Sequence, residues 1–185
     1  GFVFPYEATQ PLLKKDILYV ADQQGRVLAI QRNLGFVLWE TKVPGGVLGA
    51  LAYGRSKLFV GNRNGDLLAL NARDGSESWR FTSASKWLAV PAVSKMYNQV
   101  FARTSAGTLY ALSETKGDLL WSYPNASDKK MTIWGSGGPT LFRDSEIFQG
   151  FDDGTLVALK AENGQLIWQK KLGLNRRFED VDMSP

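Results

Sequence analysis

A pattern of one alanine, two glycines and one tryptophan occurs four times in this chain of 185 residues, with the same internal spacing each time. The second copy reads GDLLALNARDGSESW and begins at Gly65. Counted from the first glycine, the alanine lies four residues on, the second glycine ten and the tryptophan fourteen. The other copies begin at Gly25, Gly107 and Gly154, so the period is 40 to 47 residues. A period in this range is typical of a repeat architecture.

Each repeat has the pattern of short strands joined by tight turns. Apolar runs of four to seven residues alternate with turn clusters such as NRNG and RDGS. The glycines fit hairpin turns that need a positive φ, the alanine indicates close approach of a neighbouring sheet, and the tryptophan offers a large apolar surface to fill the gap. In the second repeat this predicts four strands, VLGALAY, KLFVGN, DLLALNA and ESWRFT.

Four antiparallel strands in every repeat indicate an all-β fold, a β-propeller of four-stranded antiparallel blades. We expect one partial propeller over residues 1–185, with repeats at about 11–43, 47–83, 87–125 and 133–172. An open β-solenoid is the main alternative, but its coils are usually shorter and lack two hairpin glycines. Prolines begin the innermost strands at Pro11, Pro91 and Pro139, and Pro185 holds the same place, so 173–185 reads as an interblade loop and the start of a fifth blade.

About four blades would make only part of a larger ring, because most propellers of this repeat type have more than four blades. Such an arc leaves apolar flanks on its first and last blades, and we expect these to meet a second copy or the missing half of the propeller.

Composition argues against several classes of function. The chain has no cysteine and no histidine, which removes disulfides, cysteine metal sites, the commonest general base and the commonest metal ligand. We therefore expect no catalytic, cofactor or metal site. FDDGT and NRNGD faintly resemble calcium loops but fall at hairpin glycines. The net charge of +4 is spread over all blades, so no nucleic-acid partner is expected.

Neither a signal peptide nor an apolar run near the roughly 20 residues needed to cross a bilayer is present. The sequence therefore indicates either a cytosolic chain or the mature or trimmed form of an exported one.

Two consecutive connections between blades are longer than the others. The next inner-strand proline is the twelfth residue after Trp79, but the eighteenth after Trp121 and the seventeenth after Trp168. In a propeller such connections emerge on one face and consecutive ones are neighbours, so we predict a binding platform. Its candidate partner-binding residues combine an aromatic anchor with a charged surround, as protein interfaces do, and are Met131, Ile133, Trp134, Arg177, Asp180 and Asp182. The alternatives are that Trp134 only packs on its own blade and that the aspartates only cap turn amides.

The spacing Ala-Leu-x-x-x-x-Gly-x-x-x-Trp resembles the tryptophan-docking motif of the pyrroloquinoline-quinone (PQQ) propeller superfamily. A more specific likeness lies in MTIWGSGGPT (131–140), GQLIWQKKL (164–172) and RRFEDVDMSP (176–185). Together these segments resemble the BamB family, lipoproteins of the bacterial outer-membrane β-barrel assembly machinery. The resemblance spans essentially the whole chain and corresponds to the first half of that family's eight-bladed ring.

The resemblance implies a non-catalytic scaffold in the periplasm of a Gram-negative bacterium. It would be tethered to the outer membrane by a lipid anchor that lies outside this chain. The family binds the POTRA domains of the barrel subunit through two neighbouring interblade loops, and so assists folding and insertion of outer-membrane proteins. One loop aligns with Met131, Ile133 and Trp134, and the other with Asp180 and Asp182. Trp134 takes the place of the family's arginine, which puts one charged contact in doubt.

Two other functions remain open at this point. PQQ-dependent dehydrogenases share the docking motif, but they need a calcium held by protein oxygens, a catalytic aspartate and, in many members, a disulfide between adjacent cysteines, and this chain has no cysteine. A ligand-sensing or general protein-interaction propeller would share the blades and differ in the loops.

Overall fold

The structure is a computed structural model that describes residues 9–87, 89–124, 140–151 and 154–171. Within these residues the fold is all-β, as the repeats predict, and consists of four antiparallel sheets of four strands each, in chain order. The first blade holds β1 (Leu12–Lys14), β2 (Ile17–Ala21), β3 (Arg26–Gln31) and β4 (Val37–Lys42). The second holds β5 (Ala52–Gly54), β6 (Lys57–Gly61), β7 (Asp66–Asn71) and β8 (Glu77–Thr82).

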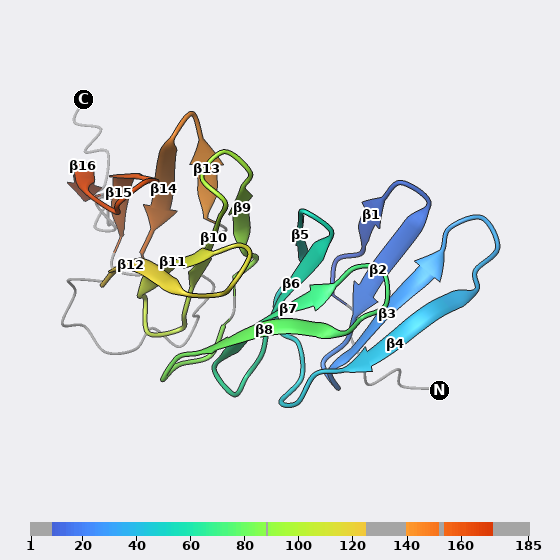
Figure 1. Cartoon of the computed structure of the whole chain (residues 1–185). Helices are drawn as coiled ribbons and strands as arrows, with labels where there is room; N and C mark the ends of the chain where they lie inside the picture. Colours follow the sequence, from blue (N-terminus) through green and yellow to red (C-terminus); the bar gives the residue numbers. More distant parts are fainter. Residues whose placement is uncertain (1–8, 88, 125–139, 152–153, 172–185) are drawn as a thin grey trace, which may run out of the picture.

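The third blade holds β9 (Ala92–Ser94), β10 (Gln99–Arg103), β11 (Leu109–Ser113) and β12 (Leu119–Tyr123). The fourth holds β13 (Leu141–Arg143), β14 (Glu146–Gly150), β15 (Thr155–Lys160) and β16 (Leu166–Lys171). Figure 1 shows the blades standing next to one another in chain order, from blue to red. No helix among the described residues is long and apolar enough to cross a membrane. The expected interblade loop and fifth blade at 173–185 lie outside the described residues.

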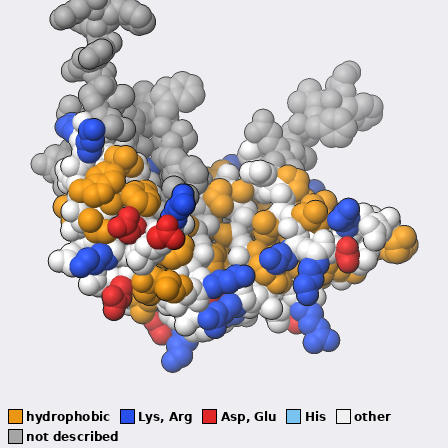
Figure 2. Space-filling model, turned by 90° about the horizontal axis from the view of Figure 1, so that it is seen from above, with side chains coloured by type: hydrophobic (Ala, Val, Ile, Leu, Met, Phe, Trp, Pro, Cys, Tyr) orange, Lys and Arg blue, Asp and Glu red, His pale blue; other side chains and the backbone are white. Residues whose placement is uncertain are grey.

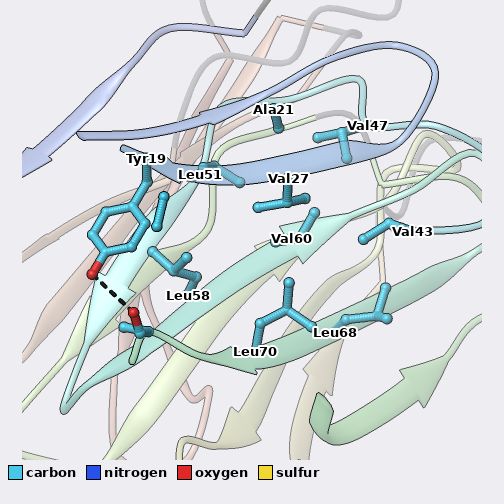
Figure 3. Packing of buried hydrophobic residues seen from close by; sticks show 12 residues of the cluster. Tyr19, Ala21, Val27, Val43, Val47, Leu51, Leu58, Val60, Leu68 and Leu70 are labelled. Carbon is cyan, nitrogen blue, oxygen red and sulfur yellow. Dashed lines mark hydrogen bonds between the residues drawn. The ribbon is translucent and has the colours of Figure 1, made fainter. Parts of the chain in front are cut away.

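The hydrophobic core lies between neighbouring blades. Three buried clusters join the first blade to the second, the second to the third and the third to the fourth. In the first cluster, Leu58 and Val60 of the second blade point towards Tyr19 and Val27 of the first (Figure 3), and the Tyr19 hydroxyl donates a 3.1 Å hydrogen bond to the Ala72 carbonyl. The four blades are therefore held together by sheet-to-sheet packing.

The tryptophans of the repeat fasten each blade to the next. The indole N–H groups of Trp39, Trp79 and Trp121 donate to backbone carbonyls of the following blade, at 3.0 to 3.1 Å. Each indole also lies against the second glycine of that blade: a Cβ at Gly117 would come within 2.6 Å of the Trp79 ring. Both repeat glycines have positive φ in every copy, which confirms the hairpin interpretation.

The repeat alanine has a second role besides the predicted close approach of sheets. Ala29, Ala69, Ala111 and Ala158 are fully buried, and each pairs across the sheet with the tryptophan of its own blade. A small side chain at this place leaves room for the indole.

The innermost strand is shorter than the sequence indicates. The prediction VLGALAY covers 47–53, whereas β5 is only Ala52–Gly54. Val47 forms an isolated bridge with Asn62, and Ala52 pairs with Phe59. Val47 and Ala52 are five residues apart while their partners are three apart, so the inner chain carries two extra residues and bulges out of the ladder.

Candidate protein-binding face

The four blades share one edge at which the long connections were expected. We call it the loop face: it carries the β2–β3, β6–β7, β10–β11 and β14–β15 hairpins together with the connections between blades. The chain leaving a blade is fixed here to that blade's own hairpin. Val43 N–H donates to the Gly25 carbonyl at 2.7 Å, and Ser83 N–H donates to the Gly65 carbonyl at 2.8 Å. The shorter connections therefore start from rigid points.

The connection between the second and third blades is buried at its centre. Trp87 is only 1% exposed, and its indole donates a 2.7 Å hydrogen bond to the Gly65 carbonyl. Its ring lies against Phe81 and Tyr110 at centroid distances of 6.2 and 5.4 Å. This described connection is thus used for packing between blades, and its aromatic residue is unavailable to a partner.

Aspartate and asparagine side chains stiffen the hairpins of this face. The Asp22 carboxylate accepts from the Arg26 backbone N–H at 2.9 Å and from the Arg26 guanidinium at 2.8 Å. In the second blade, Asn62 Oδ1 accepts from the N–H of Asp66 at 2.7 Å. Burial alone would raise the pKa of Asp22, but the hydrogen bonds from Arg26 outweigh it and hold that pKa below its ordinary value.

Arg103 is a departure from the repeat on the loop face. By strand pairing it occupies the place that Ala21, Gly61 and Gly150 hold in the other blades. Its side chain is nevertheless 3% exposed. The guanidinium donates to the Gly150 carbonyl at 3.1 Å and stands 5.6 Å from the centre of the Phe151 ring. A buried cation in place of a small residue links the third blade to the fourth.

Next to Arg103, polar side chains of the fourth blade are buried and hydrogen-bonded to each other and to the backbone. Thr140 Oγ1 donates to Gln149 Oε1 at 2.6 Å, and Gln149 Nε2 donates to the Gly150 carbonyl at 2.8 Å. Gln149 is fully buried, and the Phe151 ring lies 6.2 Å from that of Tyr123. We call Arg103, Tyr123, Thr140, Gln149 and Phe151 the floor. Tyr123 is the last residue of β12 and Thr140 directly precedes β13, so the floor contains described residues on both sides of the connection between the third and fourth blades.

The opposite edge, the turn face, carries a second departure from the repeat. Glu114 stands where the other blades have Arg32, Ala72 and Ala161, three residues before the second glycine. Its side chain is 1% exposed, and Arg55 Nε lies 3.3 Å from Oε2 without hydrogen-bond geometry. Gly54 makes room for it, because a Cβ there would lie 2.4 Å from Oε1.

Burial raises the pKa of the Glu114 carboxyl above its ordinary value, although the charges of Arg55, Lys57 and Lys95 act in the opposite direction. Figure 2 views the turn face and shows Lys and Arg side chains spread over it, with Asp and Glu in between. Glu114 is therefore a buried acid in the joint between the second and third blades, and its charged form is disfavoured there despite the nearby cations.

The six residues predicted to bind a partner lie outside the described residues; they are Met131, Ile133, Trp134, Arg177, Asp180 and Asp182. Sequence reasoning missed Arg103 and Glu114, which the structure brings into buried positions on opposite faces. Both could have been found by comparing the four repeats position by position, since each puts a large charged residue where another copy has alanine or glycine.

The aspartates that faintly resembled a calcium loop have structural partners where they are described. Asp66 accepts from the Asn62 amide at 2.9 Å and from the Thr82 hydroxyl at 2.8 Å. Across the described ranges, no group of three or more His, Cys, Asp or Glu side chains could hold a metal ion.

Four-stranded blades are joined here by tryptophans whose indoles hydrogen-bond to a turn of the next blade. This arrangement defines a β-propeller built from PQQ-like repeats. A family model described as outer membrane protein assembly factor BamB matches residues 45–185. The chain belongs to this BamB family.

Individual relatives agree with that assignment. The outer membrane protein assembly factor BamB of Yersinia pestis is 28% identical over 197 residues, which cover 97% of this chain and 49% of that protein. The crystal structure of BamB from Moraxella catarrhalis matches with a TM-score of 0.77 and 27% identity, over 90% of this chain and 48% of the other. The chain thus spans about half the length of these two relatives.

The blades alone do not distinguish this family from enzymes. A quinohemoprotein alcohol dehydrogenase from Comamonas testosteroni superposes with a TM-score of 0.73 over 88% of this chain and 34% of its own, at 18% identity. At that identity the likeness shows a common fold and nothing about activity.

Proposed function

We propose that this chain is part of a non-catalytic scaffold that assists the assembly of outer-membrane proteins from the periplasmic side of a Gram-negative outer membrane. Membership of the BamB family supports this proposal, because relatives such as that of Yersinia pestis are named as outer membrane protein assembly factors. The barrel subunit's POTRA domains are the proposed partner, and any membrane attachment would be through a lipid anchor outside this chain.

The proposed contact lies on the loop face. Met131, Ile133 and Trp134 belong to the connection between the third and fourth blades, and Asp180 and Asp182 belong to the connection that follows the fourth. Arg177 of the second connection would add a positive charge. An apolar and aromatic centre with charges around it is the composition of a protein interface, where a few residues contribute most of the binding energy.

The observation that carries the proposal is the floor. The described chain on either side of the connection that holds Trp134 is packed in place: the Tyr123 ring lies 6.2 Å from that of Phe151, and Thr140 donates a 2.6 Å hydrogen bond to Gln149. Binding loops are effective when a rigid scaffold presents them, because less conformational entropy is lost on association. By contrast, the aromatic residue of the shorter connection, Trp87, is buried in an interblade joint.

Calorimetry with the purified POTRA region of the barrel subunit from the same organism tests the proposal. We expect binding by the wild-type protein and a loss of about 2 kcal/mol or more in Trp134→Ala. A similar loss is expected in the double variant Asp180→Ala/Asp182→Ala. Met96→Ala is the matched control, because Met96 is 75% exposed and lies on the turn face, so its removal should leave affinity unchanged.

Circular dichroism would first establish that every variant folds. Absence of binding by the wild-type protein at high micromolar concentration would refute the proposed partner. Equal weakening by Met96→Ala and Trp134→Ala would refute the proposed face.

A further inference from the structure

The turn between the two inner strands of each blade lies on the turn face, near the axis of the propeller. The innermost strands β5 and β9 lie close to each other, and so do β9 and β13, so these turns converge. In the first three blades the first residue of this turn is a cation, namely Lys15, Arg55 or Lys95. Arg55 also reaches the neighbouring turn, where its guanidinium donates to the Lys95 carbonyl at 3.3 Å. The same place therefore carries a positive charge in three successive blades.

The backbone of these turns does not itself favour a cation. Lys15 has a φ of 53° and Arg55 a φ of 38°, which lie in the left-handed region where glycine, asparagine and aspartate are the common residues. The fourth blade follows this preference, because Asp144 takes the equivalent place with a φ of 48°. Turn geometry therefore does not explain the lysine and the arginine. Uncommon backbone conformations of this kind are concentrated at functional sites.

Most of the positive charge on these turns is not neutralised. The name cation rim is used here for four exposed side chains, Lys14, Lys15, Arg55 and Lys95. Within the described residues, their only salt bridge is that of Arg55 with Glu114, at 3.3 Å. Burial raises the pKa of Glu114 above its ordinary value and so disfavours its charged form. The three turns themselves contain one acid, Asp16, so the cation rim carries a net positive charge.

The distribution of charge over the whole turn face favours a narrow partner. The outer turns carry exposed acids, namely Asp74, Asp118 and Glu162, and Figure 2 shows acids between the cations of this face. A broad anionic surface would meet charges of both signs, whereas a segment that follows the inner turns would meet mainly cations. Cations on three blades also suit several spaced carboxylates better than one small anion. Met96, which is 75% exposed in the same turn as Lys95, offers an apolar contact to a polypeptide.

We propose that the cation rim binds an extended acidic segment of a partner polypeptide, whose carboxylates pair with Lys15, Arg55 and Lys95 on successive blades. The Arg55 side chain is 51% exposed, and its planar guanidinium suits a carboxylate. The segment would run over the inner turns from the first blade to the third. This surface lies on the edge of the blades opposite the loop face, so both faces can be occupied at once. The inference does not depend on the partner proposed for the loop face.

Fluorescence anisotropy of a labelled oligo-glutamate peptide, titrated with the purified protein, tests the proposal. At low ionic strength we expect binding that weakens as salt is added, because salt screens exposed charges. The triple variant Lys15→Asn/Arg55→Asn/Lys95→Gln should weaken binding at least about tenfold, which is the combined loss of three exposed ion pairs. Asparagine favours a positive φ, so the first two substitutions remove charge without disturbing their turns.

A second triple variant, Lys42→Gln/Lys170→Gln/Lys171→Gln, is the matched control. These lysines are exposed on the outermost strands β4 and β16, and their replacement changes the net charge by the same amount. The control should bind the peptide as the wild type does. Urea unfolding of Lys15→Asn gives an independent readout. Its midpoint should not fall, because within the described residues Lys15 makes no salt bridge and its φ of 53° suits asparagine.

Four outcomes would overturn the inference. The first is no binding of the peptide by the wild-type protein up to about 1 mM at low ionic strength. The second is equal weakening by the two triple variants, which would mean that net charge alone attracts the peptide. The third is a lower urea midpoint in Lys15→Asn, which would give the cation a structural role. The fourth is binding to phosphatidylglycerol vesicles that needs the cation rim and exceeds binding of the peptide, which would indicate a membrane surface instead.

Discussion

Replacing Trp79, whose indole is hydrogen-bonded to the next blade, should lower the free energy of unfolding far more than replacing Trp168. Trp79 and Trp168 occupy equivalent places in their blades, and each lies against a phenylalanine of its own blade. Only Trp79 has a following blade among the described residues. Trp79→Ala should destabilise by about 4 kcal/mol, within the range measured for buried tryptophans.

The difference between the two variants can be worked from their exposures. A tryptophan buries roughly 200 Å², and the step from 40% to 8% exposure covers about a third of that, which contributes about 1.6 kcal/mol at ~25 cal/mol per Å². The 3.0 Å hydrogen bond from the Trp79 indole to Glu114 adds about 1 kcal/mol. We therefore expect Trp168→Ala to cost about 2.5 kcal/mol less than Trp79→Ala.

Urea unfolding followed by far-UV circular dichroism measures both variants without a tryptophan signal. It should be done at low protein concentration, because any self-association would add stability that depends on concentration. Equal destabilisation by the two substitutions under dilute conditions would refute the reasoning, since it would mean that Trp168 is already docked within one chain.

Two further predictions concern the same joints. Gly117→Ala should lower the urea midpoint more than Gly35→Ala: both glycines have positive φ, but only at Gly117 would the new Cβ come within 2.6 Å of an indole, that of Trp79. Equal shifts would contradict the docking contact. Glu114→Gln should be more stable than the wild type at pH 7. Because burial raises the folded-state pKa of Glu114, its contribution is present below the unfolded pKa and is lost as pH rises through the folded pKa. Stability measured against pH should show this loss in the wild type only, and parallel profiles would argue against it.

The fold could be predicted from sequence because one spacing encodes a complete blade. The two glycines fix two of the three hairpins of a blade through positive φ, and the tryptophan fourteen residues after the first glycine packs against the next sheet. The innermost strand was predicted too long, because the two extra residues between Val47 and Ala52 do not interrupt the apolar run that indicates a strand. A bulge is set by pairing with the neighbouring strand, which one segment does not reveal.

The candidate site was predicted less completely. Connection length pointed to the loop face, and the floor formed by Arg103, Thr140 and Gln149 was not anticipated. Burial of Arg103 and Glu114 depends on space that glycine and small residues leave in adjacent blades, as Gly54 does for Glu114. Such space is a property of contacts between repeats. Within a single repeat, a charged residue reads as solvated surface.

The tryptophan contacts between blades all run in the same direction along the chain, and this direction sets an order in which the blades can fold. Each indole reaches a carbonyl that lies 33, 35 or 40 residues later in the chain, so a blade can complete its joint only after the next one has been made. A chain that emerges from its N-terminal end can therefore fold blade by blade, because each joint is made with the next blade along the chain. At every stage, the tryptophan of the blade that folded last has no acceptor for its indole N–H. Its exposed ring therefore identifies the end of the folded part of the chain.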